Sequence, residues 1–247
     1  MLKVSAVSYL NSVPFIYGLK QSELIHNIDL QLDYPSICAD KLINGNVNLA
    51  LVPVAVIPKL KDSYIISDYC IGAVGAVDTV CLYSDVPITE IKSIGLDYQS
   101  LTSVALLKVL LKEYWQLKPE LKKVDIGFEY SIKGNHAALV IGDRAFDLNT
   151  KHAYIYDLSA IWSEMTGFPF VFAAWVSNKK LSQNFISNFN LALEKGLSDI
   201  DRALALEGDN YLNCTNPEDY LNNKISYNFD SEKKKGMELY LKKVSAL

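Results

Sequence analysis

The sequence predicts an α/β protein with two lobes, because strand and helix patterns alternate along the chain in two successive series. The first series opens with Leu2 to Val7, an apolar run typical of a buried strand, and the second opens with a strand over Ser93 to Asp97. Asp85-Val86-Pro87 separates the two series, and a strand over Phe170 to Val176 leads back. Two crossings between the lobes would form a hinge that lets them close on a ligand.

We therefore expect a discontinuous first lobe of residues 1–86 and 177–247, with residues 87–176 inserted as the second lobe. Pro14 is well placed for the first turn of a helix, where the N–H that proline lacks would have no partner anyway. The first series then continues with a strand at 28–34, a helix at 35–43 ended by Asn44-Gly45-Asn46, a strand at 49–52 stopped by Pro53, a helical piece at 54–60 and a long extended region at 64–84.

The second series is predicted by a similar alternation. Its strand is followed by a polar turn and then by a very apolar helix, and a second buried strand ends in a glycine. In order, these are the turn at 98–103, the helix at 104–115, the strand at 137–141 ending at Gly142, and a helix at 158–166. From Leu181 onward the chain is mainly helical and more polar.

Composition excludes several classes of protein. Half of the 247 residues are hydrophobic and 21% are charged, which is typical of a globular chain and not of a disordered one. The net charge of −4 leaves no basic footprint for nucleic acid, so no nucleic-acid partner is expected. Glu232 to Lys235 is the locally basic stretch, and it is typical of a solvated helix face.

We expect a cytoplasmic protein that neither spans a membrane nor holds a metal. The apolar runs are far shorter than a membrane span, and no signal peptide is visible. Four cysteines without CxxC spacing are expected to be reduced and packed, and three dispersed histidines form no ligand pattern. The oligomeric state does not follow from the sequence.

The end of the first strand carries a cluster of polar side chains, Ser8, Asn11 and Ser12. The carboxyl ends of strands are where open α/β folds present groups to ligands. Each of these residues could instead cap the helix that follows, by accepting a hydrogen bond from a backbone N–H. An amide such as that of Asn11 is suited to orienting a substrate hydroxyl or carboxylate and is not a base at neutral pH.

A second polar cluster, Ser100, Thr102 and Ser103, comes just before the apolar helix of the second series. Helix N-termini bind carboxylates well, because their N–H groups lack partners and the helix dipole is positive there. Ordinary capping by one hydroxyl is the alternative, but three hydroxyls exceed what a cap needs. Thr79, in the glycine-rich crossing, could supply a further hydroxyl or could simply pack in a strand.

Asp143 and Arg144 form the charged pair at the end of the buried strand at 137–141. A guanidinium there could clamp a carboxylate. Arg144 could instead pair with Asp143, Asp147 or Glu164, and we favour that interpretation. No catalytic triad spacing, phosphate loop or paired catalytic carboxylates are found. An enzyme of this kind would orient an anionic substrate and let that substrate supply much of the reactivity.

At these residues the chain resembles the chorismate dehydratases of the futalosine route to menaquinone. Each segment alone is weak evidence, but together they follow in order across most of both expected lobes. The resemblance rests on Ser8 to Pro14, Leu49 to Pro53, Gly72 to Ser84, Ser100 to Val104, Val140 to Asp143 and Trp162 to Trp175. Beyond Lys180 only the spacing and helical character are similar.

The resemblance implies a two-lobed fold like that of the type II periplasmic binding proteins, with the ligand cleft between the lobes. It implies a cofactor-free hydro-lyase that converts chorismate, a dianion, to 3-[(1-carboxyvinyl)oxy]benzoate. The substrate's own side-chain carboxylate would act as base, and aromatisation would drive the loss of water. Catalytic roles fall on Asn11 and Thr79, where the family often has serine at the second position.

The resemblance also matches the turn residues Ser100, Thr102 and Ser103 to the substrate carboxylate. Ser8 and Asp143 complete the set of candidate substrate-binding residues, and no role is carried over to Arg144. Two alternatives stay open. One is a solute-binding or sensor protein for a small carboxylate, since one fold hosts many functions. The other is the related 1,4-dihydroxy-6-naphthoate synthase, whose first-strand motif differs from Ser8-Tyr9-Leu10-Asn11.

Overall fold

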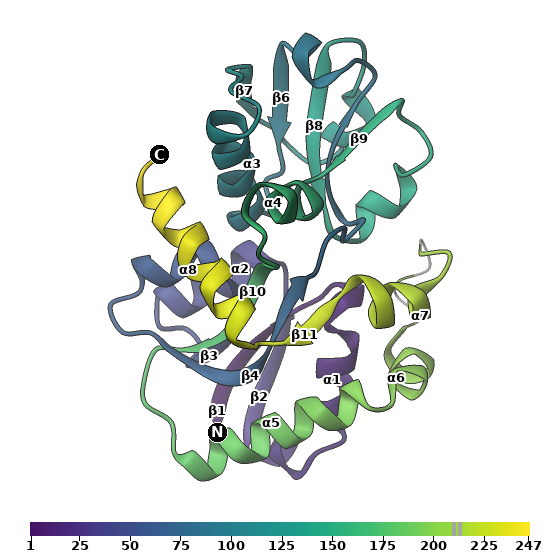
Figure 1. The fold of residues 1–247 in the computed structure, drawn as a ribbon. Coiled ribbons are helices and arrows are strands. Elements are labelled where there is room, and N and C mark those ends of the chain that lie inside the picture. Colours follow the sequence, from purple (N-terminus) through teal and green to yellow (C-terminus); the bar gives the residue numbers. More distant parts are fainter. Residues whose placement is uncertain (209–210, 212–213) are drawn as a thin grey trace.

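Two lobes, each built around one β-sheet, make up the computed structural model of the chain (Figure 1). The structure describes residues 1–208, 211 and 214–247. Within them, a sheet of strand order β11-β4-β10-β3-β1-β2 forms the first lobe, and a sheet of order β7-β6-β8-β5-β9 forms the second. This is the two-lobed α/β architecture that the sequence predicts.

The first sheet combines parallel and antiparallel pairs. Strand β1 pairs in parallel with β2 and β3, whereas β10 runs antiparallel to β3 and β4. Every residue of β3 is buried, as its continuous apolar run predicts. The strands are β1 (Leu2–Val7), β2 (Ile28–Asp33), β3 (Leu49–Pro53), β4 (Tyr64–Ala73), β10 (Phe170–Ser177) and β11 (Ser226–Asn228).

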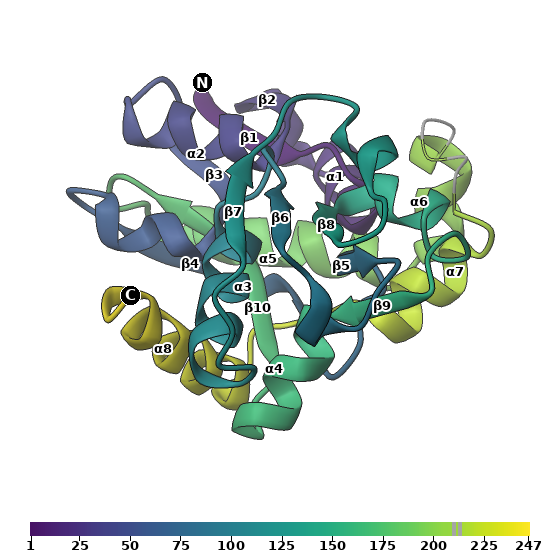
Figure 2. The same cartoon turned by 90° about the horizontal axis from the view of Figure 1, so that it is seen from above.

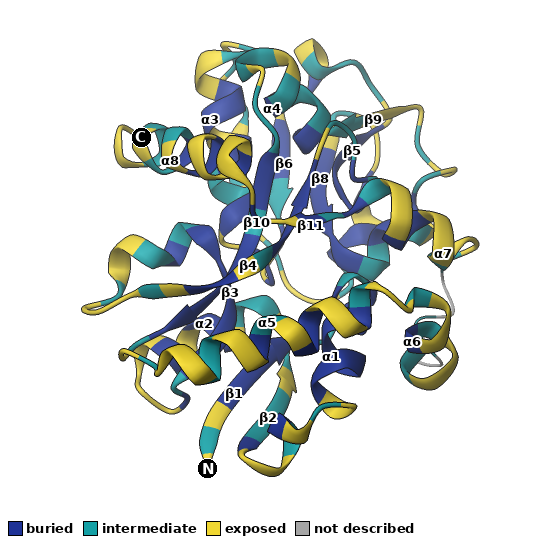
Figure 3. Cartoon of the chain, turned by 60° about the horizontal axis from the view of Figure 1, so that its bottom comes forward, coloured by how far each residue is buried: buried dark blue, intermediate teal, exposed yellow. Residues whose placement is uncertain are grey.

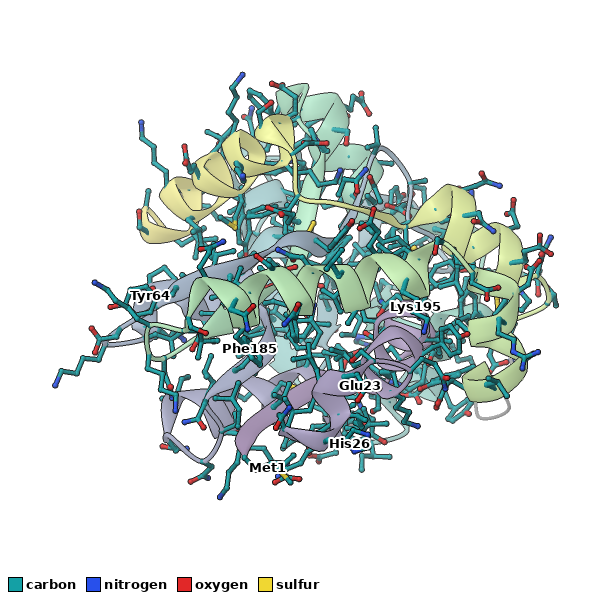
Figure 4. All side chains as sticks on the ribbon, turned by 90° about the horizontal axis from the view of Figure 1, so that it is seen from below. Met1, Glu23, His26, Tyr64, Phe185 and Lys195 are labelled. Atoms are coloured by element: carbon teal, nitrogen blue, oxygen red, sulfur yellow. The ribbon has the colours of Figure 1, made fainter. Side chains whose placement is uncertain are left out.

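Helices cover the first sheet, and the buried strands lie between them (Figure 3). Helix α5 lies across the outer face of this lobe, and Lys195 near its end approaches the segment that carries Glu23 and His26 (Figure 4). The Lys195 Nζ donates to the Gln21 carbonyl at 3.2 Å. These helices are α1 (Val13–Lys20), α2 (Pro35–Ile43), α5 (Gln183–Leu197), α6 (Ile200–Glu207), α7 (Pro217–Asp219) and α8 (Ser231–Ser245).

The second lobe contains helices α3 and α4 beside its sheet (Figure 2). Its elements are β5 (Val80–Ser84), β6 (Ser93–Leu96), α3 (Thr102–Glu113), β7 (Glu120–Lys123), β8 (His136–Ile141), β9 (Tyr154–Asp157) and α4 (Leu158–Thr166). Helix α3 begins at Thr102, two residues before the expected start, so Thr102 and Ser103 lie in its first turn. The short strands β7, β9 and β11 were not expected from the sequence.

The chain crosses between the sheets at residues 74–79 and 167–169. Sheet membership therefore differs from the expected division at 87 and 176, because β5 pairs within the second sheet and β10 within the first. The uninterrupted extended pattern at 64–84 hid the first crossing. The chain turns there through left-handed backbone at Gly75 (φ +83°) and Asp78 (φ +65°).

Asp157 fixes the first crossing to the second lobe. Its carboxylate accepts hydrogen bonds from the N–H groups of Val77 at 2.8 Å and Asp78 at 2.7 Å. The same carboxylate caps α4 by accepting from Ser159 and Ala160. One partly buried carboxylate thus joins the crossing to a helix N-terminus, and it fixes the backbone immediately before Thr79.

The C-terminal helix α8 returns to pack against both lobes. Tyr240 on α8 contacts Trp162 of α4 and Phe170 of β10, with ring centroids 6.1 Å and 5.1 Å away. Its hydroxyl donates to the Thr102 carbonyl at 2.9 Å. Lys233, which the sequence placed on a solvated face, is only 1% exposed, because its helix packs over Gly72 of β4.

Within the described residues, no helix is long and apolar enough to cross a membrane.

Helices α1 and α5 approach so closely at two glycines that no side chain fits between them. A Cβ on Gly196 would lie 1.8 Å from the Pro14 carbonyl oxygen, and one on Gly18 would lie 2.0 Å from that of Ala192. The obstructing atoms belong to the backbone, so a side chain there would force the helices apart.

We predict that Gly196→Ala lowers the free energy of unfolding by about 3 kcal/mol, as expected for overpacking against backbone. Urea titration followed by circular dichroism measures the change. Gly208→Ala is the matched control, because its Cβ would meet Leu204 no closer than 3.5 Å. Equal urea midpoints for the two variants would contradict this account of the helix contact.

Candidate active site

A cavity of about 550 Å³, its open mouth included, lies between the lobes. Apolar side chains such as Ile71, Ile141 and Phe172 form much of its wall. Its polar lining comes from both lobes and from the crossing, and consists of Tyr9, Asn11, Thr79, Ser100, Thr102 and Ser103.

Five of the seven candidate site residues line this cavity, namely Asn11, Thr79, Ser100, Thr102 and Ser103. They come together although up to 92 positions separate them in the chain, from position 11 to position 103. Ser8 and Asp143 are not among the lining residues. The Ser8 N–H donates to the Asp33 carbonyl at 2.9 Å, as part of the continued pairing of β1 with β2.

Asn11 lies in a short turn, Leu10–Ser12, between β1 and α1. The turn is held by the Tyr227 hydroxyl, which donates to the Asn11 carbonyl at 3.0 Å. The Asn11 Oδ1 accepts from the Ser12 hydroxyl at 3.1 Å. Ser12 occupies the position before α1 but makes no side-chain capping bond to it, so capping does not explain the cluster.

The three turn hydroxyls have different surroundings. Ser100 Oγ accepts from the Ser103 N–H at 3.0 Å, which is the capping alternative considered above. Thr102 Oγ1 accepts from the N–H of Ala55 in the first lobe at 3.3 Å, so it also joins the lobes. No hydrogen bond to the Ser103 hydroxyl occurs among the described residues. Ser103 therefore retains a donor at the N-terminus of α3.

Thr79 stands at the end of the crossing, where it is 2% exposed. Its Oγ1 lies 2.8 Å from the Tyr220 hydroxyl, within hydrogen-bond distance. Thr79 therefore makes a specific polar contact, which the alternative of plain packing in a strand does not explain. The backbone carbonyl of Thr79 also accepts from the Gly142 N–H at 2.9 Å.

Residues 9–10 of the first lobe meet residues 142–143 of the second beside the cavity. The Leu10 N–H lies 3.2 Å from each carboxylate oxygen of Asp143. The Tyr9 hydroxyl donates to Gln99 Oε1 of the second lobe. Gly142 (φ +66°) passes beneath the Tyr9 ring, where a Cβ would lie 2.7 Å from ring carbons. These contacts hold the lobes in a closed arrangement.

Arg144 does pair with acids, but those acids are not the ones that we favoured. Its Nη2 donates to Asp97 at 2.6 Å, and its Nη1 lies 3.5 Å from Glu129. The sequence analysis favoured Asp143, Asp147 or Glu164 as partners. Strand β6 carries the chain to Asp97 instead, beside the end of β8. Arg144 is not among the residues lining the cavity.

No Asp, Glu, His, Lys or Arg stands among the described residues that line the cavity. Burial raises the pKa of Tyr9 far above its ordinary value, with Asp97 adding to the effect, so the phenol is neutral at physiological pH. The cavity therefore offers hydroxyl, amide and backbone N–H groups, all neutral, to a ligand. Such groups can bind carboxylates by hydrogen bonds, but they cannot act as a strong base.

Two lobes, two crossings and a cavity between them define the class of periplasmic-binding-protein-like folds. Protein AF1704 from Archaeoglobus fulgidus superposes with a TM-score of 0.76 at 14% identity, over 99% of this chain and 97% of that one. The Candida albicans CA3427 gene product, described as having the generic periplasmic binding protein fold, gives 0.64 at 12% identity, over 100% and 90%. The aliphatic sulphonate-binding protein SsuA of Escherichia coli gives 0.62 at 11%, over 99% and 85%.

The chain belongs to the menaquinone biosynthesis family, whose profile matches residues 2–246. A Thermus thermophilus protein named chorismate dehydratase is 32% identical over 157 residues. That match covers 56% of this chain and 57% of the relative, so it spans little more than half the length of either protein.

Sequence reasoning missed the groups that hold the site residues. Tyr9 and Gln99 lie inside segments that we had singled out, yet nothing in the pattern showed that they would meet across the lobes. Tyr220 and Tyr227 lie in the C-terminal region, where no motif was recognised. Tyr220 and Tyr227 reach Thr79 and Asn11 because the C-terminal segment folds back to the site.

We predict that Asp143 makes the protein less stable as the pH rises toward neutrality. Burial raises the pKa of Asp143 from 3.8 to about 7, although the Leu10 N–H acts in the opposite direction. Between these values the folded protein holds a proton that the unfolded chain has lost. The free energy of unfolding therefore falls as the pH rises from about 4 to about 7.

Asp143→Asn keeps an acceptor for the Leu10 N–H but does not titrate. It should therefore remove the part of the fall in the free energy of unfolding that Asp143 causes. Urea midpoints measured from about pH 4.5 to about pH 8, which spans most of this titration, test the difference. The urea midpoint of Asp143→Asn should rise relative to that of the wild type as the pH rises. Parallel curves for the two proteins would contradict the assignment.

Proposed function

We propose that the protein is a hydro-lyase that dehydrates chorismate to 3-[(1-carboxyvinyl)oxy]benzoate in the futalosine route to menaquinone. The observation that carries the proposal is the cavity, which joins Asn11, Thr79 and the Ser100–Ser103 turn and has no charged side chain among its described lining residues. Family membership and the similarity to a protein named chorismate dehydratase support it.

In this proposal, the turn at the N-terminus of α3 binds one carboxylate of chorismate. Thr102 and Ser103 supply hydroxyls, and the first N–H groups of α3 supply the positive end of the helix dipole. The ring lies against the apolar wall that includes Ile71 and Phe172. Asn11, from the other lobe, orients the substrate through its amide.

The reaction needs a base that the cavity lining does not supply. The substrate's enolpyruvyl carboxylate takes the proton from the ring carbon that bears the ether oxygen. The electron pair of that C–H bond forms a ring double bond, the neighbouring C–O bond breaks, and the departing hydroxide leaves as water after it gains a proton. In the apolar cavity the carboxylate is poorly hydrated, which makes it a better base. Thr79 holds a hydroxyl beside the reacting ring.

Incubating the purified protein with chorismate and following product mass tests the proposal directly. We expect a product lighter than chorismate by one water. Absence of conversion together with tight binding of another carboxylic acid would favour a solute-binding protein or sensor instead. Conversion of the cyclic precursor of 1,4-dihydroxy-6-naphthoate, with chorismate left intact, would favour the related synthase.

Asn11→Ala should lower kcat by about a hundredfold or more, the usual cost of losing a preorganised polar group. Its urea midpoint should stay near that of the wild type, because Asn11 is partly exposed at the cavity. Asn184→Ala, on the exposed face of α5, is the matched control and should retain full activity. Wild-type turnover by Asn11→Ala would refute the role of the amide.

Ser103→Val removes the hydroxyl at the N-terminus of α3 and puts two methyl groups in its place. We expect KM for chorismate to rise about tenfold, which corresponds to the loss of about one hydrogen bond to a charged group. Thr102→Ala should also raise KM, with an added cost from the lost contact with Ala55. Ser187→Val on exposed α5 serves as control. Unchanged affinity in both site variants would remove the carboxylate turn from the account.

A further inference from the structure

The C-terminal segment that follows α7 forms the back of the candidate site. Residues Tyr220–Lys224 form a π-helical turn, a geometry often found at functional sites. Ile225 follows and lines the cavity, and Tyr227 on β11 donates to the Asn11 carbonyl at 3.0 Å. A region without any recognised sequence motif therefore contacts the site at several points.

Tyr220 is the deepest of these contacts. It is 3% exposed and is not among the residues that line the cavity. Its ring packs edge-on against Phe146 of the second lobe, with centroids 5.1 Å apart, and its hydroxyl lies 2.8 Å from Thr79 Oγ1. The ring is thus fixed by packing, while its single polar atom faces a residue of the candidate site.

The Tyr220 hydroxyl is paired with the hydroxyl of Thr79. Burial raises the pKa of this phenol, and hydrogen bonding by the side chains of Thr79 and Asn11 acts in the opposite direction. The phenol therefore keeps its proton at physiological pH. It thus has an O–H with which to donate to the Thr79 hydroxyl.

We propose that Tyr220 is a positioning residue that fixes the orientation of the Thr79 hydroxyl, which lies 2.8 Å from its own. The Tyr220 O–H then donates to Thr79. The proton of the Thr79 hydroxyl is consequently directed toward the cavity, where it meets the substrate. In its catalytic consequence, this inference rests on the proposed dehydration.

A double-variant cycle with Tyr220→Phe and Thr79→Val tests the inference, since each change removes a hydroxyl and nearly preserves shape. We expect Tyr220→Phe to lower kcat about tenfold with KM for chorismate within about twofold, because a misdirected group costs rate more than binding. In the Thr79→Val background, Tyr220→Phe should cause no further loss. Tyr83→Phe, which removes another buried hydroxyl away from the cavity lining, should keep wild-type kcat.

The urea midpoints of the same four proteins provide a readout without substrate. We expect the double variant to lose less than the sum of the two single variants, because both singles break the same hydrogen bond. Additive midpoints, wild-type kcat in Tyr220→Phe, or rate effects that multiply in the double variant would each overturn the inference.

These outcomes also separate this inference from the proposed function. A wild-type protein that dehydrates chorismate while Tyr220→Phe retains full kcat would leave the function standing and remove the role of Tyr220. A wild-type protein without dehydration would remove the function. In that case, a double variant that loses less stability than the sum of the single variants would still support the hydrogen bond between Tyr220 and Thr79. Additive losses would overturn that hydrogen bond as well.

Discussion

The closed contact between residues 9–10 and residues 142–143 is the constraint on which the site depends. The cavity is formed by two lobes that are linked covalently only by two short crossings, so its shape exists only while the lobes stay together. The Leu10 N–H on Asp143 and the Tyr9 hydroxyl on Gln99 tie them beside the cavity. Gly142 permits the close approach of the Tyr9 ring, which a side chain would block. The contact adjoins Asn11 in sequence, so closing the lobes also places the amide.

The charge distribution places the ionic groups behind the cavity wall. Arg144 and Asp97 form an ion pair. The Asp97 carboxylate also accepts hydrogen bonds from the N–H groups of Gln99 and Ile141, so it supports the turn that leads to Ser100. Neutral hydroxyls and an amide form the polar lining itself. The dianionic substrate that we propose would be held in such a cavity by directed hydrogen bonds. In the proposed reaction the substrate's own carboxylate brings a base into this neutral lining, and aromatisation drives the loss of water.

Local sequence patterns predict most of the helices and strands and single out the polar clusters that line the cavity. Leu2–Val7 and Leu158–Thr166 have the bounds that apolar periodicity predicts, and five candidate site residues meet in one cavity. Partners distant in sequence were not predictable. The pattern of β5 does not say which sheet it joins, and nothing local connects Arg144 with Asp97 or Tyr220 with Thr79. Those pairings follow from the path of the chain through the crossings and back along the C-terminal segment.

The central claim is that a small dianion lies between Asn11 and the N-terminus of α3. A crystal structure of the protein soaked with 3-[(1-carboxyvinyl)oxy]benzoate tests it most directly. The account predicts one product carboxylate within hydrogen-bond distance of Ser103 and the first N–H groups of α3, with the aromatic ring against Phe172 and the Asn11 amide in contact with the product. Product bound at any other surface, with this cavity empty, would contradict the account.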